Sequence, residues 1–163
     1  MKKIIYSLFA IILIASSACK KDTVKVSPKA FDDITYQDIK DLYDETGFTF
    51  QEIILKTPDG VDVLKPGSVI FYSASGILGK LKIINISIQN GLIFDMVNYS
   101  ASTGSKILFK NGASVTPSSG FDLTTGLEVA NPGFDGFKYS LQNSIGNWKL
   151  LPFLSTRMYV YSK

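Results

Sequence analysis

Apolar and polar positions divide this chain of 163 residues into three stretches. An almost unbroken apolar run of 12 residues, Ile4 to Ala15, follows Lys2 and Lys3. A polar stretch then extends to about residue 30, and short apolar runs separated by turn residues fill the rest. A helix that crosses a bilayer needs about 20 apolar residues, so the first run is too short to span. The pattern predicts a removable export signal at 1–18 and a single domain at 31–163.

Helical spacing of apolar residues occurs at the start of this domain. Ile39 and Leu42 lie three residues apart, Thr35 offers an N-cap, and Gly47 ends the run. These signals predict one short helix over 36–45. The helix is also acidic, and we interpret its acids as a solvated outer face rather than a cation site. They are Asp38, Asp41, Asp44 and Glu45.

After Gly47 the apolar pattern changes to a period of two, which is typical of strands. Asn90-Gly91 lies between two apolar runs and is a strong hairpin signal, because both residues tolerate positive φ. Asn111-Gly112 is expected to end a strand, and Asp59 to Asp62 to form a turn rather than a calcium loop. The expected strands are 48–55, 69–73, 80–88, 92–99 and 106–110.

Two parts of the chain, 66–100 and 132–162, carry similar glycine and aromatic signals in the same order. We interpret them as two copies of a three-stranded unit, that is, an internal duplication. Together with the other strands this gives about eight. The fold class we expect is mainly β: an antiparallel β-sandwich or a partly closed barrel with one short N-terminal helix.

Composition supports a β-rich core and excludes several classes. The 11 Phe and 8 Tyr suit a pleated interior, and the single cysteine cannot form a disulfide within the chain. The net charge is +3, and removal of Lys2 and Lys3 leaves +1. Because no basic cluster is present, we do not expect a nucleic-acid partner.

That cysteine stands at the end of the export signal, in Ser16-Ser17-Ala18-Cys19-Lys20-Lys21-Asp22. The segment resembles the lipobox of bacterial lipoproteins, and its Cys-Lys-Lys-Asp start is similar to that of lipoproteins of the Bacteroidota. The resemblance implies cleavage between Ala18 and Cys19 and a diacylglycerol on the Cys19 thiol. Ser16 stands where the family prefers leucine. The alternative is an ordinary cleaved secretory signal with a free thiol.

The lipobox resemblance also implies where the protein lies. Two or three acyl chains hold a protein on a membrane stably. The polar segment 19–30 is then a lipidated, flexible tether. Lys20 occupies the position where an aspartate retains some lipoproteins in the inner membrane, so we expect the outer membrane. Whether the domain faces the periplasm or the cell surface stays open.

The sequence offers little for catalysis. Without histidine, and with its cysteine assigned to lipid, the mature chain has no serine triad, cysteine protease site or zinc site. Paired carboxylates, as in glycoside hydrolases, are the surviving route. Asp95, Asp122, Glu128 and Asp135 are the candidates. We expect no enzyme and no metal.

Binding is the function that we expect instead, with an envelope protein or a glycan as the partner. Trp148 is assigned to the core. The segment Val69 to Ser105 resembles HmuY-type haem-binding lipoproteins, which implies haem capture through Met96 and Met158 as an alternative. Core packing of both methionines is the simpler explanation. We therefore expect no cofactor, with haem as the alternative.

Overall fold

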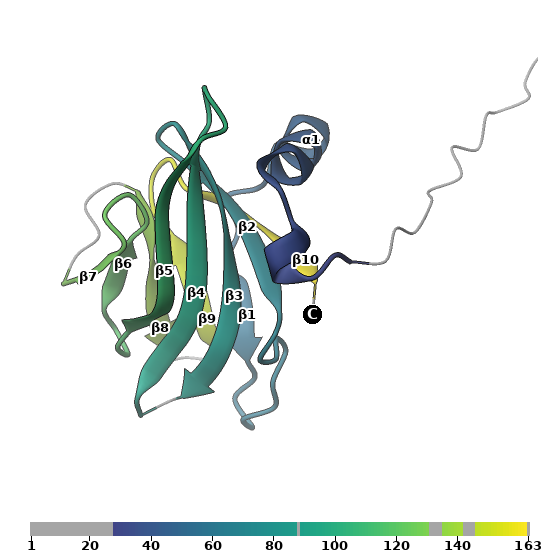
Figure 1. Cartoon of the computed structure of the whole chain (residues 1–163). Helices are drawn as coiled ribbons and strands as arrows, with labels where there is room; N and C mark the ends of the chain where they lie inside the picture. Colours follow the sequence, from purple (N-terminus) through teal and green to yellow (C-terminus); the bar gives the residue numbers. More distant parts are fainter. Residues whose placement is uncertain (1–27, 88, 131–134, 142–145, 163) are drawn as a thin grey trace, which may run out of the picture.

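The computed structural model describes residues 28–87, 89–130, 135–141 and 146–162. The predicted signal segment 1–18, the cleavage pair Ala18 and Cys19, and residues 19–27 of the tether lie outside these residues. Within them the chain forms one α-helix, a short 3-10 helix and ten strands (Figure 1). The prediction of a mainly β fold with one N-terminal helix is therefore confirmed.

The helices are η1 (Phe31–Asp33) and α1 (Tyr36–Thr46). The strands are β1 (Ile53–Lys56), β2 (Val69–Ala74), β3 (Ile77–Ser87), β4 (Gly91–Ser100), β5 (Lys106–Val115), β6 (Gly120–Asp122), β7 (Leu127–Val129), β8 (Gly136–Leu141), β9 (Trp148–Pro152) and β10 (Arg157–Ser162). Sheet A has the strand order β10-β2-β3-β4-β5, and sheet B has the order β1-β9-β8-β6-β7. Every pairing is antiparallel, and the two sheets form a sandwich (Figure 1).

The main core lies between the two sheets. Aromatic rings dominate it: Phe94 of sheet A meets Phe121 of sheet B edge-on, with ring centroids 4.8 Å apart. Trp148 is 6% exposed and packs on Tyr139, with centroids 4.9 Å apart. The assignment of Trp148 to the core is confirmed.

A second core covers the outer face of sheet A. The side chains of Phe31 in η1, Ile34 in the link after it and Ile39 in α1 are buried there against residues of β2, β3 and β4. Helix α1 begins at a capping box, in which Thr35 and Asp38 bond each other's backbone N–H groups, and ends at Gly47 with φ 71°. The sequence predicted this helix and both of its ends to within one residue.

A buried lysine fixes η1 to the sheet. Lys80 on β3 is 3% exposed, and its Nζ donates to the carbonyl of Ile34 at 2.7 Å and to that of Phe31. The same Nζ lies 4.5 Å from the centre of the Phe31 ring. Phe31 begins η1 and Ile34 caps its end, and both residues are buried, so the lysine satisfies carbonyl acceptors that the fold removes from water.

Another polar chain crosses the main core. Tyr72 Oη on β2 donates to Asn98 Oδ1 on β4, and Asn98 Nδ2 donates to the carbonyl of Leu123 at 2.6 Å. Strand β3 lies between β2 and β4, and its residue opposite Tyr72 is Gly79. The Tyr72 ring lies against the Gly79 backbone where a side chain would otherwise be. A glycine is therefore needed for the ring to reach across β3.

The predicted internal duplication is wrong as a structural repeat. The first set, β2 to β4, forms a continuous meander in sheet A. In the second set β8 and β9 pair in sheet B, but β10 crosses to sheet A and pairs with β2. The crossing follows Pro152, after which the chain turns at Leu154 with φ 39°. Residues 132–134 and 142–145 of the second set lie outside the described residues.

Three local predictions also need correction. Strand β5 does not end at Asn111-Gly112 but continues to Val115, because Gly112, with φ 63°, forms a bulge opposite Asp95. The expected strand 80–88 begins earlier, at Ile77, and a second bulge between Ile83 and Asn85 leaves Ile84 on the surface, 41% exposed. The first strand is shorter than 48–55 and begins at Ile53. The Asn90-Gly91 hairpin is confirmed, with Gly91 at φ 90°.

Candidate functional site

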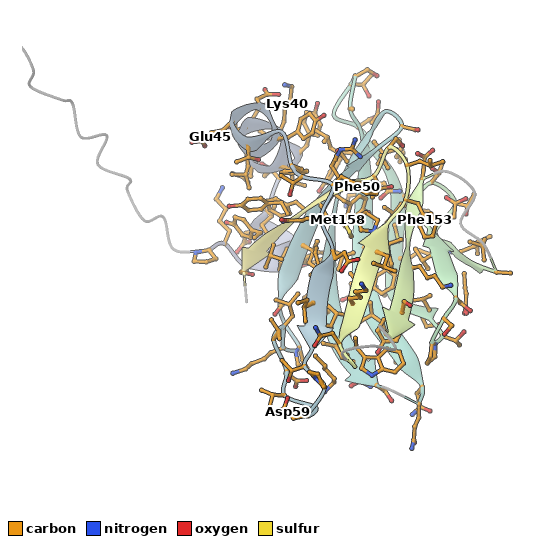
Figure 2. All side chains as sticks on the ribbon, turned by 180° about the vertical axis from the view of Figure 1, so that it is seen from behind. Lys40, Glu45, Phe50, Asp59, Phe153 and Met158 are labelled. Carbon is orange, nitrogen blue, oxygen red and sulfur yellow. The ribbon has the colours of Figure 1, made fainter. Side chains whose placement is uncertain are left out.

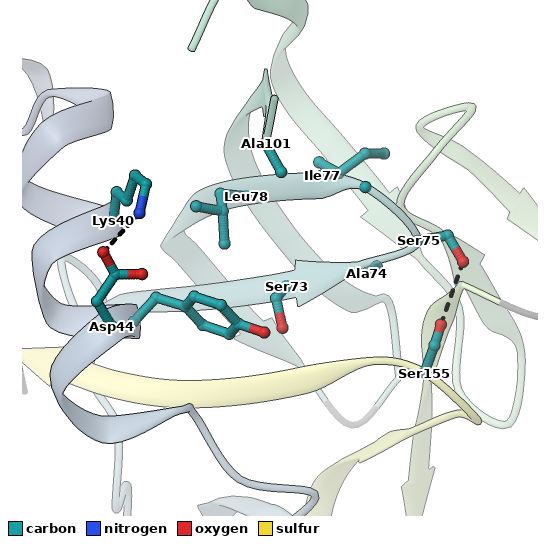
Figure 3. A pocket seen from close by; sticks show the side chains of 11 residues that line it. Lys40, Asp44, Ser73, Ala74, Ser75, Ile77, Leu78, Ala101 and Ser155 are labelled. Atoms are coloured by element: carbon teal, nitrogen blue, oxygen red, sulfur yellow. Dashed lines mark hydrogen bonds and ion pairs between the residues drawn. The ribbon is translucent and has the colours of Figure 1, made fainter. Parts of the chain in front are cut away.

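A hollow of about 330 Å³ opens at one end of the sandwich, on the outer side of sheet A (Figure 3). Helix α1 forms one wall, and the turns after β2, β4 and β9 form the rest. Its floor is the pair Ser73 and Leu78, which lie directly opposite each other on β2 and β3. Loops at the end of a rigid sandwich are a common place for binding residues.

The wall from α1 carries one charge of each sign. Lys40 Nζ donates to Asp44 Oδ2 at 2.5 Å, one helical turn along (Figure 3). This hydrogen bond raises the pKa of the Lys40 amino group above its usual value. The two charges balance, so the wall presents a donor and an acceptor without net charge.

Two hydroxyl groups in the hollow have no hydrogen-bond partner among the described residues. Ser73 is only 8% exposed, and its hydroxyl makes no hydrogen bond to another described residue. The Tyr43 hydroxyl likewise makes none within the described part of the chain, while its ring meets Phe48 edge-on at 5.2 Å. Ser73 is nearly buried and Tyr43 is half-buried, so both hydroxyls keep hydrogen-bonding capacity for solvent or for a ligand.

The rim opposite α1 is organised by a carboxylate. Asp135 Oδ1 accepts hydrogen bonds from Ser75 Oγ at 2.7 Å and from Ser155 Oγ. The two serine oxygens lie 3.3 Å apart (Figure 3). Ser155 follows Leu154, whose φ of 39° is strained for a residue with a side chain. Asp135 was one of the four predicted carboxylates, and the structure places it beside the hollow.

The other three predicted carboxylates lie elsewhere, each bonded to its own neighbours. Asp95 pairs with Lys82 at 3.1 Å and accepts from Gly112 N at 2.9 Å. Asp122 accepts from the backbone N–H groups of Thr124 and Thr125, at 2.7 and 3.1 Å. These contacts are local turn and bulge interactions, not a pair of acids facing each other across a cleft.

Glu128 is held by Thr116 at the end of β5. The backbone N–H of Thr116 donates to Glu128 Oε1 at 3.1 Å, and the Thr116 hydroxyl donates to the same oxygen. The side-chain hydrogen bond from Thr116 lowers the pKa of the Glu128 carboxyl below its usual value. Glu128 is therefore ionised at neutral pH, and its carboxylate is engaged by the hydrogen bonds from Thr116.

Met96 and Met158 are both completely buried in the main core. They lie on β4 and β10, which are separated by β2 and β3, so about 14 Å of sheet divides the two strands. Tyr72 and Leu81, from the intervening strands, belong to the same core cluster. Axial haem ligands must face each other across one iron, and this arrangement gives the haem alternative no support.

The predicted turn at Asp59 and the acidic helix face have structural explanations. Asp59 accepts from the Thr57 hydroxyl, and Thr57 N donates to the carbonyl of Val61 at 2.9 Å. This turn lies at the end of the molecule opposite Lys40 and Glu45 (Figure 2). The acids of α1 are at the surface or bonded to neighbours, as Asp41 is to Gln37 at 2.6 Å. No cluster of three or more metal-ligating side chains occurs in the described part of the chain.

Sequence reasoning did not find the hollow. Its lining residues lie in α1 and in three turns that are far apart along the chain, and only the fold brings them together. The one local signal was the Ser75-Gly76 turn, which is common in β proteins and points to no ligand.

Comparisons with known proteins add no family to these findings. No family model, no curated protein and no solved structure matches the chain. Among the described residues, no helix is long and apolar enough to cross a membrane.

Proposed function

We propose that this protein is a lipid-anchored lipoprotein of the bacterial cell envelope, with a non-catalytic β-sandwich that binds a ligand. The observation that carries the binding role is the hollow beside α1. It combines two hydroxyls that have no partner within the described part of the chain, a charge-balanced wall and a rim ordered by Asp135. Such a set of fixed polar groups around a partly apolar floor suits recognition.

The chemistry of the hollow favours binding over catalysis. General acid–base work needs a group that can gain and lose a proton near neutral pH, and the whole chain has no histidine. Within the hollow Asp44 is paired with Lys40, and Asp135 at the rim accepts from two serine hydroxyls. Both carboxylates are therefore already engaged as hydrogen-bond acceptors within the protein.

The anchor rests on Cys19 and the lipobox resemblance. Eight residues, 20–27, separate that cysteine from the first described residue, Pro28. The nine Cα–Cα steps between Cys19 and Pro28 reach about 30 Å at most when the chain is extended. At Lys29 the chain is already fastened to the domain, because Lys29 N donates to Tyr161 Oη at 3.0 Å and Lys29 Nζ to Asp38 at 2.6 Å. The domain is therefore held within a short distance of the outer membrane, on its periplasmic or its outer side.

Native mass spectrometry of the full-length protein, extracted gently from its own membrane, tests the proposal. We expect a polypeptide mass that begins at Cys19 plus two or three acyl chains, with additional non-covalent mass from a ligand. The variant Cys19→Ser should lose the acyl mass and leave the membrane fraction. A wild-type protein cleaved elsewhere and free of lipid contradicts the anchor. An acylated protein whose ligand is lost on Ser73→Ala but retained on Ser114→Ala links the binding role to the hollow.

A further inference from the structure

The size of the hollow limits what can occupy it. Its volume of about 330 Å³ lies near the lower end of the roughly 300–1,000 Å³ of small-molecule sites. One compact ring fits this space, whereas an extended peptide needs a groove with several subsites.

The polar groups of the hollow suit a ligand with several hydroxyls. Ser75 and Ser155 use their protons on Asp135, so their oxygens offer lone pairs and accept hydrogen bonds from a ligand. Ser73 and Tyr43 have no described partner, so each hydroxyl can donate or accept. A hydroxyl group of a ligand both donates and accepts, and it matches both kinds of position.

The charges disfavour an acidic ligand. Lys40 is neutralised by Asp44, so it offers little to an added carboxylate or phosphate. Asp135 places a negative charge at the rim, where it repels anions. A cation is the competing possibility, but both serine protons already bind the same Asp135 oxygen.

The floor and one side of the hollow are apolar. Leu78 lies on the floor, and Ala101 from the turn after β4 lies beside it (Figure 3). A sugar ring has a face of C–H groups and an edge of hydroxyls, which is the same division of apolar and polar surface. The hydroxyls on the opposite sides of the hollow, from α1 and from the β9–β10 turn, would then meet the edge of the ring.

We propose that the hollow binds a neutral sugar ring, either a free monosaccharide or the terminal residue of a glycan. This inference rests on the proposed binding function and names the chemical class of its ligand. Ser73 and Tyr43 bond ring hydroxyls from the floor and the α1 wall, Ser75 and Ser155 accept from hydroxyls at the rim, and the apolar ring face packs on Leu78.

The test is a titration of the mature chain, residues 19–163 with Cys19→Ser, followed by amide chemical shifts. The probes are neutral hexoses, disaccharides that end in the same hexoses, a uronic acid, an amino sugar and a free amino acid. Each is raised to about 50 mM, above the Kd expected for a weak single-ring site. We expect saturable shifts of Ser73, Ser75, Leu78 and Ser155 with at least one neutral hexose, and equal or tighter binding of the matching disaccharide if the source is a glycan.

Matched variants connect those shifts to the hollow. Ser73→Ala should weaken binding about fivefold to tenfold, the loss of one neutral hydrogen bond. Ser114→Ala, on the exposed part of β5, should change the Kd less than about twofold. Ala101→Leu should fill the hollow and abolish the shifts, while unchanged spectra elsewhere show that the fold is kept.

Each of the other outcomes refutes either the neutral sugar as the ligand or the hollow as the site. Saturable shifts at the hollow with only the uronic acid, the amino sugar or the amino acid overturn the neutral sugar and leave the hollow as a binding site. Sugar shifts away from the hollow, or unaffected by Ser73→Ala, overturn the site. No saturable shift with any probe overturns the sugar proposal, whereas the acyl mass at Cys19 decides the anchor independently.

Discussion

Replacing Gly79 with alanine tests the crossing of the main core by Tyr72. A methyl group on Gly79 would lie well under 3.0 Å from Cζ, Cε2 and Oη of Tyr72, closer than real Cβ contacts. The backbone of Gly79 is not in the left-handed region, so alanine meets no conformational penalty there. The whole cost of Gly79→Ala is therefore steric and falls on the Tyr72 ring.

The expected loss in free energy of unfolding has two parts, the displacement of the Tyr72 ring and the loss of its hydrogen bond. Tyr72 is fully buried, so displacing it overpacks the core, which costs about 1–3 kcal/mol. The displaced hydroxyl leaves Asn98 Oδ1 without its donor, and a buried unsatisfied acceptor costs about 1–3 kcal/mol more. We expect Gly79→Ala to lower the free energy of unfolding by about 3–5 kcal/mol and Tm by about 10 °C or more.

Urea unfolding followed by the fluorescence of Trp148, the only tryptophan, measures this loss. The control is a double-mutant cycle with Tyr72→Leu, whose shorter side chain leaves room for the methyl group. In that background Gly79→Ala should cost less than about 1 kcal/mol, so the coupling free energy is about 2 kcal/mol or more. A loss under about 1 kcal/mol in the wild-type background, or an equal loss in both backgrounds, refutes the steric reasoning.

Three further predictions concern stability and titration. Lys80→Met should lower the free energy of unfolding by about 2–4 kcal/mol and speed amide hydrogen exchange in α1, because two buried carbonyls lose their donor. The control Lys56→Met breaks an ion pair with Asp62 at β1 of sheet B, away from η1, and should cost less than about 1 kcal/mol. Thr116→Val should raise the pKa of Glu128 toward its usual value, as measured by NMR titration, and an unchanged pKa rules out the contact. Because the folded state has the lower pKa, the stability from this contact is present at neutral pH and is lost as pH falls through the folded pKa. Burial raises the pKa of Tyr139 to about 12. The free energy of unfolding of the wild type should therefore fall by about 1 kcal/mol relative to that of Tyr139→Phe between about pH 9 and pH 11. An equal dependence of unfolding free energy on pH in the two proteins contradicts the shift.

Features set by neighbouring residues were predictable from the sequence. The Thr35 cap, the apolar spacing at Ile39 and the stop at Gly47 define α1, because each acts within one or two helical turns. The Asn90-Gly91 hairpin was predictable for the same reason. The Asn111-Gly112 dipeptide carries the same local signal but forms a bulge, since the paired strand β4 continues past Asp95 and keeps β5 in the sheet. A turn signal alone cannot tell whether the partner strand goes on.

Long-range pairing decided the features that sequence reasoning missed. Strand β10 joins β2 across the sandwich, so the apparent second copy of the three-stranded unit is divided between the two sheets. The sequence predicts Asp135 as a candidate catalytic carboxylate, but its contacts depend on Ser75 and Ser155, which lie 60 and 20 residues away. The hollow is likewise assembled from α1 and three turns, and no short segment carries its pattern.

Helix α1 contributes both to the stability of the fold and to the candidate site. One side of the helix places Ile39 in the second core, and the adjoining side places Lys40 and Tyr43 on the wall of the hollow. The helix keeps this position because Lys80 fixes η1 directly before it and the Thr35 capping box sets its first turn. Loosening η1 with Lys80→Met should therefore weaken ligand binding in the hollow and also destabilise the fold, although Lys80 does not line the hollow. Lys56→Met, on sheet B, should leave binding unchanged, and equal effects of the two variants on binding would show that the hollow does not depend on the docking of α1.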